Sequence, residues 1–167
     1  MIDLAAYVLE PLWQDGARLL SRGQPRGRSA GRVPAVLVVA PVGDHPAPAS
    51  LKRLKHEYAL RAELDPAWAV RPLALAQHQG RPVLVLEDPG GEPLACLLGR
   101  SLTLPQGLRL AIGLAAALSQ LHGRGLLHKD LKPAHVVVNG ATGQVWLTGF
   151  GSPRACHVSA RPLSLPR

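Results

Sequence analysis

The sequence predicts a mixed α+β fold, with a strand-rich first half and a second half that is mainly helical. Two observations support this prediction. Short apolar runs bounded by Gly, Pro and Asp-Gly turns fill residues 1–88, where a single helical pattern interrupts them. The longest stretch with helical spacing, residues 105–123, comes only after those runs. With 167 residues, 47% of them hydrophobic, the chain is long and apolar enough to bury a core.

A strand pair is expected near the start of the chain. Residues 7–12 and 18–21 flank the turn at Asp15-Gly16, which favours a hairpin. The next segment, residues 22–34, is rich in Arg, Gly and Pro and is expected to be a loop.

One more strand, a helix and a second strand pair complete the first half. The continuous apolar run at 35–40 is consistent with a buried strand. Residues 41–48 contain three prolines and are expected to be a loop, after which Ser50 is a candidate N-cap for a helix over 51–64. Two strands then follow around the turn Gln79-Gly80, at residues 70–76 and 82–87.

The second half begins with a strong breaker, Asp88-Pro89-Gly90-Gly91, followed by a short helix over 93–98. The long helix at 105–123 comes next, and then a tight loop at 128–135. A small hairpin is expected at the end, with strands at 136–138 and 144–148 and a turn at Asn139-Gly140.

The most informative segment starts at His128. It reads His128-Lys129-Asp130-Leu131-Lys132-Pro133-Ala134-His135, continues into an apolar triplet and is followed, one hairpin later, by Gly149-Phe150-Gly151. This pattern resembles the catalytic loop of protein kinases, H-R-D-L-K-P-x-N, and then their D-F-G turn. A lone HxD would be a weak signal, whereas the whole pattern at this spacing is a strong one.

The resemblance covers about residues 7–151. It implies a protein-kinase-like fold, with a β-rich N-lobe over 1–88, a hinge and an incomplete helical C-lobe over 89–151, and an unstructured tail over 152–167. More narrowly, the chain is similar to the N-terminal serine/threonine-kinase-like module of bacterial proteins that also contain an ATPase module and a sensor histidine kinase. That similarity implies a role in signal transduction, with protein partners or other modules of the same protein.

The resemblance gives roles to three residues of the loop. Asp130 takes the position of the catalytic base and Lys132 that of the residue contacting the transferred phosphate, while His128 is a structural brace. The alternative for Asp130 is a loop residue that caps local amides.

Other parts needed for phosphoryl transfer are absent. Gly149 replaces the metal-binding Asp, and His135 replaces the metal-binding Asn, so Mg²⁺ loses the hard oxygen ligands that it requires. The third strand has no Lys, and Ala40 is the residue expected at that position. Glu57, which the family pairs with that Lys, is therefore expected to point into solvent.

The nucleotide site is weakened further. Only Gly16 remains of the glycine-rich loop, and Arg18 or Arg22 are the candidates for replacing the missing Lys. Glu87 and Asp88 are candidate cofactor-binding residues at the hinge, where the N–H donor for adenine is either Asp88 or Pro89, and Pro89 has no N–H. ATP and Mg²⁺ are possible by resemblance, and the losses make their binding doubtful.

The net charge of +8 specifies no partner. Its main source is an Arg run, expected to be a solvated surface, with a second group in the tail: Arg18, Arg22, Arg26, Arg28 and Arg32, then Arg154, Arg161 and Arg167. Few aromatic residues and no RNA-binding signature argue against a nucleic-acid partner. The longest apolar run is too short to span a membrane. Two distant cysteines, Cys96 and Cys156, fit a reducing, cytoplasmic setting.

Three functions therefore remain to be weighed. The first is an inactive, pseudokinase-type module that regulates or scaffolds a signalling protein. The second is a weakly active ATP-dependent serine/threonine kinase that uses Asp130 and Lys132, and the third is a basic nucleic-acid-binding fragment. Because a kinase C-lobe continues beyond the D-F-G turn, the chain is also expected to be truncated, with an apolar side of the 105–123 helix exposed.

Overall fold

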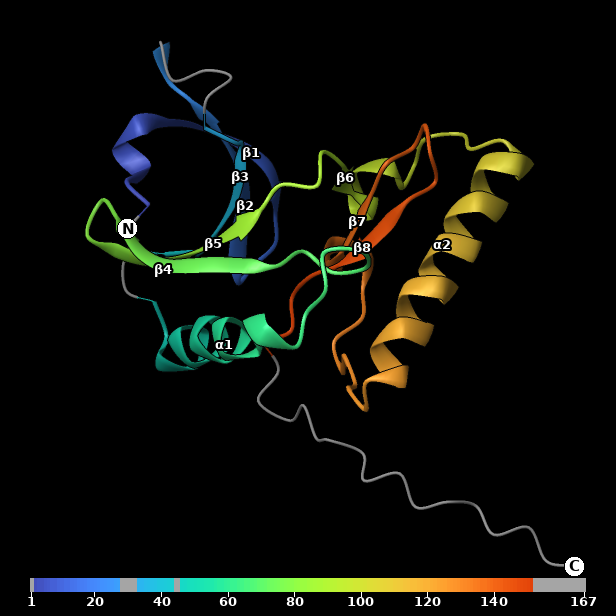
Figure 1. Cartoon of the computed structure of the whole chain (residues 1–167). Helices are drawn as coiled ribbons and strands as arrows, with labels where there is room; N and C mark the ends of the chain where they lie inside the picture. The colour runs from blue at the N-terminus through green and yellow to red at the C-terminus, as the bar shows by residue number, and fades with distance from the viewer. Residues whose placement is uncertain (1, 28–32, 44–45, 152–167) are drawn as a thin grey trace, which may run out of the picture.

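The computed structural model describes residues 2–27, 33–43 and 46–151. Its elements form two groups that lie side by side, a five-stranded sheet with one helix and a three-stranded sheet with a longer helix (Figure 1). This is the mixed α+β arrangement expected from the sequence, and it is compatible with a kinase-like fold. The predicted tail over 152–167, together with Arg28, Arg32 and Cys156, lies outside the described residues.

The five-stranded sheet is antiparallel throughout, in the order β1-β2-β3-β5-β4. A short 3-10 helix, η1 (Leu4–Ala6), precedes it. The strands are β1 (Tyr7–Gln14), β2 (Arg18–Pro25), β3 (Val36–Pro41), β4 (Pro72–His78) and β5 (Arg81–Glu87).

The predicted loop over 22–34 was wrong at its start, because β2 continues to Pro25. Gly23 pairs with Leu9 of β1 and with Val36 of β3. A Cβ atom at Gly23 would lie 2.9 Å from a methyl group of Val36, so the strand requires a glycine at this crowded position. The glycine that suggested a loop is thus part of the sheet.

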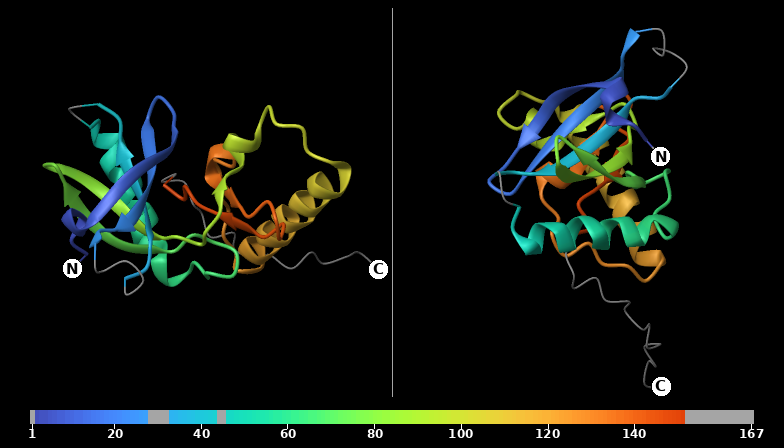
Figure 2. Two further views of the ribbon diagram at one scale, coloured as in Figure 1. Left: turned by 90° about the horizontal axis from the view of Figure 1, so that it is seen from above. Right: turned by 90° about the vertical axis from the view of Figure 1, so that its left-hand side faces the viewer.

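Helix α1 (Pro48–Ala59) packs against β4 and β5, and a 3-10 turn, η3 (Leu60–Ala62), extends it (Figure 2). It begins earlier than predicted, and Ser50 is not its N-cap. Ala47 occupies the cap position without a side-chain hydrogen bond. Pro48 starts the first turn, where its fixed φ suits a helix and its missing N–H costs nothing.

The second group is built around a small antiparallel sheet in the order β6-β7-β8. Thr103 and Gln106 form a reciprocal capping box at the start of its long helix, α2, which packs against β8. The elements of this group are β6 (Glu92–Pro93), η4 (Leu94–Leu97), α2 (Leu104–Gly123), η5 (Pro133–His135), β7 (Val136–Val138) and β8 (Val145–Leu147).

Residues 68–70 tie the two groups together. The Val70 N–H donates to the Leu147 carbonyl at 2.8 Å, and the Leu147 N–H donates to the Trp68 carbonyl at 2.9 Å. The segment after η3 therefore adds to β8 as a short parallel bridge. Since all of these residues are buried, the first group is fixed to the second through the core.

Helix α2 is apolar on two sides, and only one of them is covered. Leu110, Ala117 and Leu121 are buried against β7, β8 and residues 64–69. The second apolar stripe is exposed, as the sequence led us to expect, and consists of Leu104, Leu108 and Ile112. Among the described residues, none of the helices is long and apolar enough to cross a membrane.

Replacing Leu121 with Ala should lower the free energy of unfolding by about 2–5 kcal/mol, because its side chain is fully enclosed and the cavity left behind cannot be filled. Urea denaturation monitored by circular dichroism measures the change. Leu104→Ala is the matched control on the same helix, since this leucine is 76% exposed, and it should change stability by less than about 0.5 kcal/mol. Equal losses for the two variants would contradict the assignment of the covered face.

Candidate functional site

A cavity of about 260 Å³ lies between the five-stranded sheet and the loops around β7 and β8. We call it the central cavity. Its walls come from the β1–β2 turn, β3, α1, the loop before η5 and the residues after β8. It is lined by most of the residues that the sequence singled out, namely Arg18, Glu57, Asp130, Lys132, His135 and Gly149.

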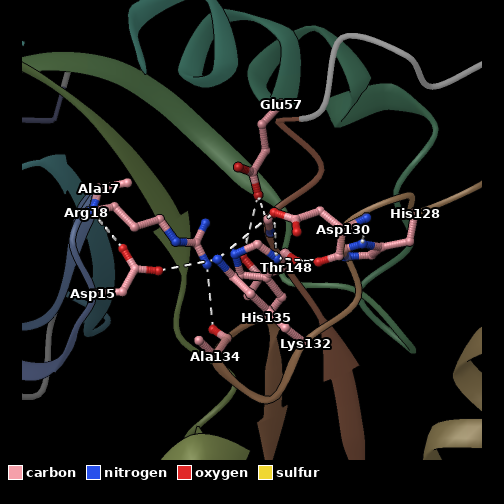
Figure 3. Close-up of polar contacts among 11 residues, drawn as sticks. Asp15, Ala17, Arg18, Glu57, His128, Asp130, Lys132, Ala134, His135 and Thr148 are labelled. Carbon is pink, nitrogen blue, oxygen red and sulfur yellow. Dashed lines mark hydrogen bonds and ion pairs between the residues drawn. The ribbon is translucent and has the colours of Figure 1, made fainter. Parts of the chain in front are cut away.

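Glu57 is buried at the base of this cavity, so the expectation that it points into solvent was wrong. It is 2% exposed. One carboxylate oxygen accepts the Gly149 N–H at 2.7 Å and the Thr148 hydroxyl at 3.4 Å. Burial raises the pKa of Glu57, and the charge of Arg18 and these hydrogen bonds act against that rise. The carboxylate thus joins α1 to the residues after β8 (Figure 3).

Val39, and not Ala40, occupies the place on β3 that faces Glu57. Alternate residues of a strand point to opposite faces. Leu37 and Val39 belong to the inner face and Val39 lines the cavity, whereas Ala40 packs on the outer face with Val36 and Val38. The conclusion that no Lys stands here is unchanged, but the residue in its place was misassigned.

Arg18 supplies the positive charge near Glu57. Its guanidinium reaches into the cavity from β2 and donates to the Ala134 carbonyl at 3.4 Å (Figure 3). Burial lowers the pKa of Arg18, while the charges of Glu57, Asp15 and Asp130 raise it. Arg22 does not take this role, since it pairs with Asp88 at 2.6 Å. Neither arginine is part of a freely solvated surface, which corrects that expectation for this part of the Arg run.

Asp130 and Lys132 both reach the central cavity. The Asp130 side chain is 47% exposed, and its carboxylate lies 4.0 Å from the Lys132 ammonium and 3.5 Å from Nδ1 of His135. Lys132 is also 3.2 Å from Asp15 in the β1–β2 turn. Burial raises the pKa of Asp15, but backbone N–H groups and then the Lys132 charge lower it, and the net shift is downward. The ammonium therefore bridges the turn and the loop.

His128 makes two hydrogen bonds to the backbone around the loop. Its Nε2 donates to the Thr148 carbonyl at 2.7 Å, and its Nδ1 accepts the Asp130 N–H at 3.4 Å. These two bonds require a neutral imidazole with the proton on Nε2. Burial lowers the pKa of His128, which favours the neutral form.

His135 is also held neutral and serves the backbone. Its Nδ1 donates to the Asp130 carbonyl at 2.6 Å, and burial lowers its pKa to about 3. Its Nε2 is buried without a hydrogen-bond partner among the described residues. The Asp130 loop is therefore shaped by two neutral histidines that lie close to each other.

Position 149 accommodates only a glycine. Its φ is +80°, a left-handed conformation that side chains disfavour, and a Cβ atom would lie 2.6 Å from the His135 ring. The glycine at 149 and the histidine at 135 are therefore coupled, because the imidazole of His135 fills the space that a side chain at position 149 would need. Sequence reasoning identified both positions but not this contact.

The residues present do not fit Mg²⁺. The ion takes carboxylate, carbonyl or water oxygens in near-octahedral geometry, but Gly149 has no side chain and His135 offers a buried nitrogen. In the described part of the chain, no three His, Cys, Asp or Glu side chains are placed to hold a metal ion. Asp130 is the exposed carboxylate beside these two positions, and one carboxylate does not make a magnesium site.

The hinge candidates are engaged with arginines. Glu87 pairs with Arg71 at 2.6 Å. The Asp88 carboxylate accepts from Arg22 at 2.6 and 3.1 Å and from the Gly90 N–H at 2.9 Å. Neither residue lines the central cavity. The sequence analysis placed both at the hinge of a nucleotide site, and that role stays a prediction.

The chain is similar in sequence to several bacterial serine/threonine protein kinases. It is 30% identical to the serine/threonine-protein kinase drp72 of Corynebacterium efficiens over 155 residues, which are 92% of this chain and 25% of that protein. It is 29% identical to the kinase PknA of Corynebacterium glutamicum over 164 residues, and 39% identical to PknA of Mycobacterium tuberculosis over 83 residues. No protein-family model matches the chain.

These matches bear out the resemblance to serine/threonine protein kinases. The two longer alignments cover nearly the whole chain and only 25% and 29% of the two relatives. The chain thus corresponds to a part of these proteins, and the shared part includes the loop at Asp130 and the segment at Gly149.

Replacing Gly149 with Ala should lower the free energy of unfolding by about 2 kcal/mol or more, from left-handed backbone strain of about 1–2 kcal/mol plus the collision with His135. Gly16→Ala is the control, because a Cβ there meets no atom within 4 Å. Chemical denaturation of both variants measures the difference. A neutral Gly149→Ala would contradict the proposed contact.

Below neutral pH, His135 should lower the free energy of unfolding of the protein. Its pKa is about 3 in the folded state and about 6.5 when unfolded, so the unfolded chain binds the extra proton and stability falls as the pH drops below 6.5. Between pH 7.5 and 5 the loss is about 2 kcal/mol. His135→Asn should therefore show a shallower decline in urea denaturation over that range. Exposed His122→Asn is the control, and identical pH profiles for wild type and His135→Asn would contradict the prediction.

Proposed function

We propose that this relative of serine/threonine protein kinases is a pseudokinase-type module, which regulates or scaffolds a bacterial signalling protein and does not transfer phosphate. The observation that carries the proposal is the paired change at Gly149 and His135. Together they remove the oxygen ligands for the metal and fill the space in which a side chain at residue 149 could be restored. Phosphoryl transfer depends almost entirely on positioning and charge neutralisation, so these losses remove its main source of catalysis.

Two further features support the proposal. Val39 provides no cation where the third strand faces Glu57, and Glu57 is engaged with the backbone of Gly149 instead. Residues at positions of the kinase pattern make hydrogen bonds to the backbone in this chain. His128, His135 and Glu57 together fix the loop at Asp130 and the segment after β8. A fold that keeps these contacts without the metal ligands is suited to presenting a surface.

The second candidate is a weak ATP-dependent serine/threonine kinase. One observation favours it, because Asp130 is half exposed and lies beside Lys132 on the cavity wall. In this alternative Asp130 would accept the proton of a substrate hydroxyl and Lys132 would contact the transferred phosphate. It would need a source of charge neutralisation other than the two metal-ligand positions.

We assign residues up to Asp88 to an N-lobe and residues 89–151 to a hinge and the first part of a C-lobe. A cytoplasmic location and a protein partner go with a signalling role. The exposed stripe on α2 is one surface where such a partner or a further part of the same protein could pack.

Incubation with γ-³²P-labelled ATP and a generic acceptor such as myelin basic protein, with Mg²⁺ and then with Mn²⁺, should give no label above background. Asp130→Ala should give the same background, because the residue has no transfer step to support. A related kinase that retains the metal-binding Asp serves as the positive control. Incorporation of label by the wild type that disappears in Asp130→Ala would establish the second candidate and refute the first.

A further inference from the structure

We propose that strand β2 fills the middle and the hinge end of the cleft between the two groups of elements in place of a nucleoside, and that the ion pair between Arg22 and Asp88 is the latch that keeps this part of the cleft closed. The inference concerns ligand entry. It depends on the kinase-like cleft and holds whether or not the chain transfers phosphate.

The inward face of β2 carries three side chains at alternate positions, Arg18, Leu20 and Arg22. Each has a cross-strand neighbour on β3, where Pro41 pairs with Arg18, Val39 with Leu20 and Leu37 with Arg22. Since side chains at i, i+2 and i+4 share one face, β2 directs all three into the cleft. Arg18 reaches the end nearest Glu57, and Arg22 reaches the end nearest the segment 87–91.

Leu20 closes the middle of the cleft. It packs in one cluster with Leu37 and Leu86 of the sheet and with Val137 of β7. An open slot for a flat purine ring would leave its apolar walls accessible to water when no ligand is bound. Here these four walls are 0–3% exposed, so the side chains have closed against one another.

Arg22 closes the hinge end. Its guanidinium contacts both Asp88 oxygens and also the Gly91 carbonyl, a fork that matches a carboxylate in two places. The Asp88 side chain is only 5% exposed, so water screens this pair weakly. Removing one partner would leave a largely buried charge, which makes opening costly.

Three further contacts hold the hairpin of β1 and β2 against the second group. Cys96 Sγ lies 3.4 Å from the Leu12 carbonyl, Lys132 pairs with Asp15, and Arg18 donates to Ala134. The hollow that does touch Asp88 and Pro89 lies elsewhere, since its walls come from residues 34–35, 66–73 and 144–146 and not from β1 or β2. The central cavity, likewise, includes no residue of 84–91. Among the described residues, neither of these two cavities therefore joins the loop at Asp130 to the hinge.

Adenosine is the probe, because it needs the hinge end of the cleft and has no phosphate to transfer. Its binding to the full chain is measured by isothermal titration calorimetry and by the shift in melting temperature. If the open form is one tenth of the population or less, the apparent affinity of the wild type falls in proportion. Arg22→Ala and, separately, Asp88→Asn should bind adenosine at least about tenfold more tightly than the wild type.

The exposed pair Arg124–Asp65 provides the matched control. Its N–O distance is 2.7 Å, close to that of the latch, but it lies on the surface. Arg124→Ala should bind adenosine no better than the wild type. The charge-swapped double variant Arg22→Asp with Asp88→Arg should return to wild-type affinity if the ion pair itself closes the cleft.

Two results would overturn the proposal. One is equal adenosine affinity in the wild type, Arg22→Ala and Asp88→Asn, and this includes no binding by all three. The other is a swapped variant that binds as tightly as Arg22→Ala. Asp88→Asn preserves the size of the side chain and its bond to Gly90, so the test does not depend on Arg22→Ala folding well. The label-transfer assay is scored separately, because a nucleoside cannot report on phosphoryl transfer.

Discussion

The hydrogen bond from the Gly149 backbone to the Glu57 carboxylate is the constraint on which the arrangement of the site depends. A buried carboxylate needs partners, and Glu57 finds them in the backbone that follows β8. The position of α1 is thereby coupled to the segment that carries Gly149 and Phe150. In this chain an interaction that could have served an ion pair with a lysine has become a purely structural link.

Two buried histidines also hold the backbone of the site in place. His128 and His135 each donate a hydrogen bond to a backbone carbonyl, and burial lowers the pKa of both rings, which favours their neutral form. These hydrogen bonds therefore fix the shape of the loop at Asp130. We interpret this as a catalytic-type loop that has been retained for its shape, which agrees with the proposal that the module presents surfaces instead of carrying out transfer.

Much of the fold could be predicted from the sequence, because it rests on local patterns. The turn at Asp15-Gly16, the apolar run of β3 and the helix over 105–123 all reflect short-range chemistry. The errors arose where tertiary contacts decide. Gly23 belongs to a strand because Val36 approaches it closely, and Glu57 is buried because the residues after β8 return beneath α1.

The sequence predicted which residues lie at the site, but it did not predict the contacts between them. The sequence identified Gly149 and His135 as replacements, but their mutual contact requires positions 14 residues apart to meet. It also allowed either Arg18 or Arg22 near Glu57, and the place of Asp88, which pairs with Arg22, distinguishes the two. One signal was available beforehand: Arg18 and Arg22 are four residues apart, so in a strand they fall on one face together with Leu20, which lies midway between them.

The bridge between residues 68–70 and β8 has a consequence for how the molecule opens. Its two hydrogen bonds join the segment after η3 to β8 and lie in the core. Unfolding of either group of elements would therefore expose buried residues of the other group to water. The amide hydrogens of Val70 and Leu147 should therefore exchange with solvent only when the whole chain unfolds, as members of a single cooperative unit. The β1–β2 hairpin contacts the second group through side chains, whereas the β2–β3 ladder joins it to the five-stranded sheet, so it moves with that sheet.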